Sequence, residues 1–245
     1  MRLLANRAAL TLTVIFFVGL EALTAVTSVY WPLFSAFMAL LVVGTILTLR
    51  EDVRTRGPHV LILPLAYVGS VFLFHLFVSR GLFQQLFIAL ATVGLFLLVA
   101  RGIEWAFPTW NWFFTTGTFF LFTAGMYGLH FHLHFPLWAV VLSVGAVTFL
   151  LSLHVLGRAS LSSPRRMFWS ALLTLLMSEL LGAFAFLPLS YLVVSGTVFV
   201  AFYVTLHLLQ RYLYDHLTPR LVREYLLLGL VAVGLILSTA RWTVV

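Results

Sequence analysis

Long apolar runs, separated by short polar or basic stretches, are the main pattern of this chain of 245 residues. Most runs hold about 15 to 20 residues, and a helix of about 20 residues crosses the roughly 30 Å hydrocarbon core of a bilayer. The pattern predicts nine membrane spans, at residues 8–28, 33–49, 60–79, 82–100, 112–129, 137–156, 167–187, 190–209 and 225–239.

The connections between these runs alternate in length and charge. Those after the first, third, fifth and seventh spans are short, whereas those after the second, fourth, sixth and eighth are longer and mostly basic. Twelve of the 14 arginines lie at the amino terminus or in the longer connections, and Arg80 and Arg241 lie on the other side. The positive-inside rule then places the amino terminus in the cytoplasm and, with nine spans, the carboxyl terminus outside.

Internal repeats accompany this alternation. Gly44, Gly94, Gly145 and Gly196 recur at spacings of 50, 51 and 51 residues, and the pattern [ST]-L-H-x-L-x-R appears at residues 152–158 and 205–211. Small residues let membrane helices approach closely, so we interpret the glycines as packing positions, with a pore constriction as the alternative. The expected fold is all-α, a polytopic transmembrane helical bundle of four repeated hairpins plus a final helix, in a single integral membrane domain over residues 1–245.

Composition supports this class and excludes several others. Hydrophobic residues make up 62% of the chain and charged residues 9%, against about a quarter charged in soluble domains. Without Lys the chain cannot form a lysine Schiff base, and without Cys it has no disulfide, thiolate metal site or cysteine-held iron–sulfur cluster. The net charge of +7 is explained by orientation in a cytoplasmic-type membrane, so the expected partner is the lipid bilayer and not nucleic acid. A protein partner or a homo-oligomer stays open.

Two carboxyl side chains lie within predicted spans. Glu21 and Glu179 sit about a dozen residues from the cytoplasmic ends of the first and seventh spans, whereas the other five acids lie in connections or at span ends near Arg. Ionisable groups inside a membrane are costly and often functional. We expect a proton- or cation-binding pair that meets when the first and last hairpins come together. The alternative is two neutral carboxyls, each hydrogen-bonded to a nearby Ser or Thr.

Histidines suggest a metal site near the outer surface. His130, His132 and His134 follow one another at alternate positions at the end of the fifth span, and His75 lies near the outer end of the third. Imidazole is a good ligand for zinc and similar divalent metals. The spacing therefore favours divalent metal binding by these residues, although histidine is also common at membrane interfaces.

A second histidine hypothesis concerns the repeated motif. His154 and His207 occupy equivalent positions near the cytoplasmic ends of two spans. Two histidines on helices can ligate haem b without any cysteine, whereas a repeated interfacial histidine can simply extend its polar atoms to the headgroups.

The function expected from these patterns is transport or binding of a small solute or ion, proton- or metal-linked, inside the bundle. Transporters commonly arise from internal repeats with sites between them, which makes this inference an analogy. The alternatives are a membrane oxidoreductase with His-ligated haem or metal, and a non-catalytic subunit that packs against a partner. The sequence contains no phosphate-binding glycine loop, nucleophile elbow or H-E-x-x-H motif, so whether the protein is an enzyme stays open.

Overall fold

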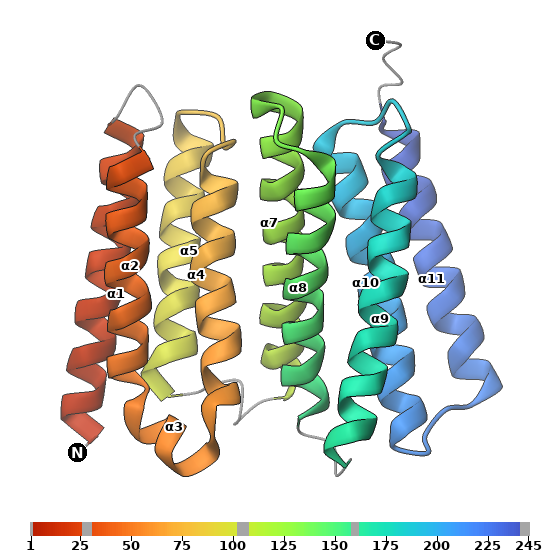
Figure 1. Cartoon of the computed structure of the whole chain (residues 1–245), viewed down its shortest axis with the longest axis horizontal. Helices are drawn as coiled ribbons and strands as arrows, with labels where there is room; N and C mark the ends of the chain where they lie inside the picture. The colour runs from red at the N-terminus through yellow and green to blue at the C-terminus, as the bar shows by residue number, and fades with distance from the viewer. Residues whose placement is uncertain (1, 26–30, 102–107, 158–161, 241–245) are drawn as a thin grey trace. The chain divides into compact units, whose positions relative to one another are not determined.

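The computed structural model describes residues 2–25, 31–101, 108–157 and 162–240, and over these every regular element is a helix, with turns and short connections between them (Figure 1). A long helix occupies each predicted span, and two short elements follow the second. The long helices are α1 (Arg2–Ala25), α2 (Trp31–Thr48), α4 (Ile62–His75), α5 (Leu82–Arg101), α7 (Pro108–Leu133), α8 (Leu137–Leu156), α9 (Ser163–Phe184), α10 (Tyr191–Leu213) and α11 (Pro219–Ser238). The short ones are α3 (Arg50–Arg56) and the 3-10 turn η1 (Pro58–Leu61).

Seven helical segments in the described parts of the chain are long and apolar enough to cross a membrane. They are α1, η1 with α4, α5, α8, α9, α10 and α11. The apolar part of α2 is shorter, at Ser35–Thr48, and α7 interrupts its apolar surface with Asn, Thr and His side chains. The protein is therefore a helical chain with several helices fit for a membrane, and the nine-span topology stays a prediction.

The helices fall into two compact units, Met1–Thr118 and Phe119–Val245, with the boundary inside α7. In unit 1, α1 packs against α2 and α5, and α4 packs against α2 and α5 (Figure 1). Phe16 on α1 meets Phe72 on α4 edge to face, with ring centroids 5.4 Å apart. The Tyr67 hydroxyl on α4 donates a 3.0 Å hydrogen bond to the Ala91 carbonyl on α5. These two contacts attach α4 to α1 and to α5.

In unit 2, α8 packs most extensively against α9, and α10 packs against α9 and α11. The Tyr127 hydroxyl on α7 donates a 2.7 Å hydrogen bond to the Leu181 carbonyl on α9, and the rings of Phe119 and Phe202 stack at 4.0 Å between α7 and α10. The main partner of α8 is thus α9, across one of the longer connections, instead of α7, its expected hairpin partner. The four-hairpin repeat stays a prediction that this unit does not show in its packing.

The four repeated glycines all face a neighbouring helix. A Cβ on Gly44 would meet Leu12 of α1, and a Cβ on Gly94 would overlap the Tyr67 hydroxyl of α4. A Cβ on Gly145 would meet Ser178 of α9, and one on Gly196 would touch Ile236 of α11 at 3.4 Å. These contacts support the interpretation of the glycines as packing positions. Gly44 and Gly94 face the helix that precedes their own in the chain, whereas Gly145 and Gly196 face the helix that follows.

Candidate functional site

Two neighbouring helices of unit 1 each carry an ionisable group near their C-terminal end. Glu21 lies one turn before the last residue of α1, and His75 is the last residue of α4. The His75 side chain is buried, with 4% of its surface exposed. Burial is the main influence on the imidazole, and the Glu21 carboxyl and the Leu20 carbonyl of α1 act on it to a smaller extent. The structure therefore places His75, predicted for metal binding, on a helix that contacts the one carrying Glu21, predicted for proton binding.

The surroundings of the His75 ring are mainly apolar. The ring stacks on Phe87 of α5 at a centroid distance of 6.3 Å and an angle of 14°. Among the residues that the structure describes, its buried Nδ1 atom has no hydrogen-bond partner. The hydrogen bonding of the ring is therefore incomplete. A buried polar atom that lacks a partner costs about 1–3 kcal/mol. This cost makes His75 a candidate for a role beyond packing.

Glu21 has only a weak local partner. The Thr24 hydroxyl donates a 2.6 Å hydrogen bond to the Glu21 backbone carbonyl and lies 3.4 Å from the Oε2 atom of the carboxyl. One hydroxyl proton serves the nearer acceptor first, so the contact with the carboxyl is secondary. The carboxyl is half-buried and remains able to interact with His75. The alternative of a carboxyl hydrogen-bonded to a nearby Thr therefore has a contact of its own at Glu21.

Glu179 lies at a comparable height on its own helix. It precedes the last residue of α9 by five positions, as Glu21 precedes the last residue of α1 by four. Both carboxyls lie nearer the C-terminal end of their helix than its N-terminal end. Glu179 is exposed on the surface of unit 2. Since each unit is described by itself, the pairing of Glu179 with Glu21 stays a prediction.

The three histidines after α7 have separate surroundings. The Nδ1 atom of His130 lies 2.6 Å from the Phe135 carbonyl, whereas the His132 ring meets Tyr191 edge to face at 5.5 Å. His134 adopts a left-handed backbone with φ of 52°, which turns the chain toward α8. Within the described ranges, no three His, Asp or Glu side chains come together to hold a metal. His75 belongs to unit 1, and divalent metal binding by these four residues stays a prediction without a formed site.

His154 and His207 also have different surroundings. His154 is fully buried on α8. His207 on α10 is half-buried and stacks on Tyr203 at 5.8 Å and on Tyr225 of α11 at 4.5 Å. An axial haem ligand needs a ring edge that is open to the iron and a flat apolar slot for the macrocycle. The tyrosine rings that cover His207 do not fit this requirement, so these two histidines do not form a haem site.

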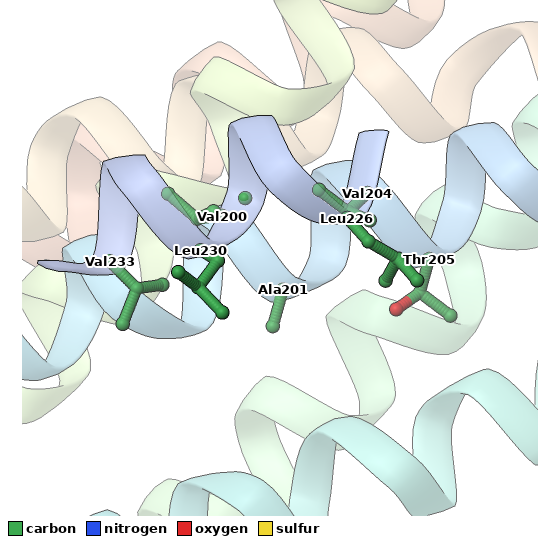
Figure 2. A pocket seen from close by; sticks show the side chains of 8 residues that line it. Val200, Ala201, Val204, Thr205, Leu226, Leu230 and Val233 are labelled. Atoms are coloured by element: carbon green, nitrogen blue, oxygen red, sulfur yellow. The ribbon is translucent and has the colours of Figure 1, made fainter. Parts of the chain in front are cut away.

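Two further features were not expected from the sequence. The first is the buried polar face of α7, on which Thr115 and Thr118 are fully buried; the density of Thr in this span was its only sequence signal. The second is an apolar groove of about 540 Å³ between α10 and α11, lined mostly by Val and Leu, which Figure 2 shows. The groove carries little polar chemistry, so the Glu21–His75 pair is the stronger candidate site.

No protein-family model, curated protein or solved structure matches this chain.

Proposed function

We propose that this chain is a multi-pass membrane protein that binds or transports a small solute or ion within its helical bundle, and that protonation of Glu21 is coupled to this activity. The observation that carries the proposal is the carboxylate of Glu21 acting on the buried imidazole of His75. Two facing ionisable groups on helices fit for a membrane are typical of proton relays and ion sites.

The coupling has a simple electrostatic basis. When one proton binds, the charge of the site changes by one unit, and charges interact strongly where little water is present. A cation or a polar solute bound nearby would therefore compete or cooperate with that proton. Glu179 is the second carboxyl in this proposal, since it stands at a comparable height on a helix that is also long and apolar enough to cross a bilayer.

The two alternative functions have less support. A membrane oxidoreductase requires histidines arranged around a metal or haem, and the separate surroundings of His130, His132 and His207 do not favour it. A non-catalytic subunit requires a face for its partner, and the exposed apolar face of α11 would also suit lipid. The paired Glu21 and His75 favour solute or ion binding.

The proposal is tested by proton flux in liposomes. Purified protein is reconstituted with an internal pH-sensitive dye, and monovalent and divalent cations are added outside. We expect cation-dependent proton movement in the wild type and its loss in Glu21→Gln and Glu179→Gln. The control is Glu224→Gln, because Glu224 forms an exposed ion pair with Arg220 at 2.9 Å on the surface of α11. Full activity in both span variants would contradict the proposed role of the carboxyls.

We also propose that the protein lies in a cytoplasmic-type membrane with its amino terminus inside. Twelve of its 14 arginines are on one side of the predicted topology, as the positive-inside rule requires. Reporter fusions after Arg56, Ser163 and Thr218 are all expected to report the cytoplasm. An external signal from any one of them would contradict the nine-span topology.

A further inference from the structure

We propose that the apolar groove between α10 and α11 binds an acyl chain of one anionic phospholipid, whose headgroup is held by Arg211 and Arg223. The proposal goes beyond solute or ion transport, because it uses neither Glu21 nor His75. It requires only that α10 and α11 lie in a membrane, and both helices are long and apolar enough to cross one.

The groove is a formed cavity with an apolar lining (Figure 2). Its volume of about 540 Å³ lies within the roughly 300–1,000 Å³ that is usual for sites of small ligands. A Cβ on Gly229 of α11 would lie 3.1 Å from the Val204 Cγ2 of α10, so the absence of a side chain there lets the two helices meet along the groove. Leu230 lines the groove and is 75% exposed. An acyl chain would cover this apolar surface.

The groove-lining faces of both helices continue to one basic end. Leu226 and Thr205 lie at one end of the groove in Figure 2. On α10, Arg211 follows Val204 by seven residues, and on α11, Arg223 precedes Leu226 by three, so both continue the faces that line the groove. With a rise of 1.5 Å per residue, Arg223 lies roughly 5 Å beyond Leu226 and Arg211 roughly 9 Å beyond Thr205 along the helix axes.

Aromatic side chains mark this end as the level of the membrane interface. The His207 ring stacks on Tyr225 at 4.5 Å and on Tyr203 at 5.8 Å, which joins α10 to α11 beside the end of the groove. Tyr212 and Tyr214 are exposed in the same region. Tyr is enriched at the level of the lipid headgroups. The groove therefore extends from this level toward the hydrocarbon layer, which is the orientation that an acyl chain requires.

The charges at this end suit an anionic headgroup. Arg220 is already paired with Glu224 at 2.9 Å. Within the described ranges, neither Arg211 nor Arg223 forms an ion pair, and the remaining acid, Asp215, is exposed in the turn after α10. The predicted topology places this end in the cytoplasm, and basic pockets between membrane helices on that side bind anionic lipid headgroups. A lipid phosphate would supply the negative charge that these two arginines lack.

The test is native mass spectrometry of the full chain, purified in detergent and incubated with dioleoylphosphatidylglycerol or dioleoylphosphatidylcholine. The two lipids have the same acyl chains, so a difference in binding reports the headgroup. The wild type is expected to retain one phosphatidylglycerol molecule and to bind it at least about fivefold more tightly than phosphatidylcholine, because each Arg near an anionic lipid contributes about that factor.

Variants separate the headgroup from the acyl chain. Arg211→Gln and Arg223→Gln should each weaken phosphatidylglycerol binding about fivefold and leave phosphatidylcholine binding unchanged. The matched control is Arg54→Gln, which removes an exposed arginine from α3 of unit 1 and should change neither. Ala201→Phe should fill the groove and abolish binding of both lipids, whereas Gly234→Phe should keep them, since an added Cβ there meets nothing within 4 Å.

Equal affinity of the wild type for the two lipids would overturn the inference, and that comparison needs no variant. Unchanged phosphatidylglycerol binding in both Arg variants, or its retention by folded Ala201→Phe, would overturn it as well. A dimer of the wild type that Ala201→Phe dissociates would assign the groove to a second copy of the chain instead. None of these outcomes depends on proton flux, so the proposed function and the lipid site can fail separately.

Discussion

Gly94→Ala is expected to destabilise unit 1 by about 2–4 kcal/mol, because overpacking and a disturbed buried hydrogen bond act together. A Cβ on Gly94 would overlap the Tyr67 hydroxyl and lie 3.0 Å from its Cζ atom. The ring cannot move away easily, since it packs edge to face on Phe114 at 5.9 Å and its hydroxyl donates to Ala91. The measurement is thermal or denaturant unfolding of the purified protein in detergent.

A second substitution isolates the cause. Tyr67→Phe removes the overlapping oxygen, so the double variant Gly94→Ala with Tyr67→Phe should recover part of the lost stability. Tyr67→Phe alone should cost only about 0.6 kcal/mol, as is typical of interhelical hydrogen bonds in membranes. The control is Gly182→Ala on α9, where an added Cβ meets nothing within 4 Å. That change should stabilise the helix by about 1 kcal/mol. Equal effects of Ala at the two glycines would contradict the packing explanation.

The sequence predicted the positions of the long helices because each long apolar run indicates a helix of about the length that crosses a bilayer. The prediction was less accurate at the ends of helices and for helices that contain many polar residues. The first and seventh spans begin earlier in the structure, at Arg2 and Ser163, because Arg and Pro are compatible with the first turns of a helix although they are not apolar. The helix α7 contains many Thr residues, whose hydroxyls bond back to the carbonyls of the preceding turn, as Thr116 and Thr123 do. Hydropathy counts such residues as polar although their hydrogen bonds are internal.

Partners between helices were harder to predict than the helices themselves. The alternation of short and long connections indicated that α7 and α8 form a hairpin, yet α8 packs mainly on α9. Connection length limits which helices can meet, but close packing of small residues decides which do. Likewise, the sequence showed Glu21 about a dozen residues into its span and His75 near the outer end of its own, but not that α1 and α4 are neighbours, because helix pairing depends on the rotation of each helix.

Gly145→Leu is expected to separate α8 from α9 and to lower the unfolding free energy of unit 2 by about 3 kcal/mol, at the upper end of the usual range for overpacking. A Cβ on Gly145 would lie 3.0 Å from the Ser178 Oγ and 3.5 Å from the Thr174 Cγ2. Ala at this position should cost much less, because the small Ser178 hydroxyl can rotate, and Gly145→Ala with Ser178→Ala should approach wild-type stability. Gly182→Leu is the control, since the space there is open.

The same variant separates the two interpretations of the repeated glycines. If Gly145 serves helix packing, Gly145→Leu lowers stability, and proton flux falls only in proportion to the folded protein that remains in the liposomes. If instead Gly145 lined a pore, Leu would obstruct it, and flux would be lost while the unfolding transition stayed at the wild-type position. Gly145 is a useful position for this comparison because a Cβ there would meet Ser178, the residue before Glu179. Under the packing interpretation, Ser178→Ala in the Gly145→Ala background should restore the folded fraction and, in the same proportion, the flux.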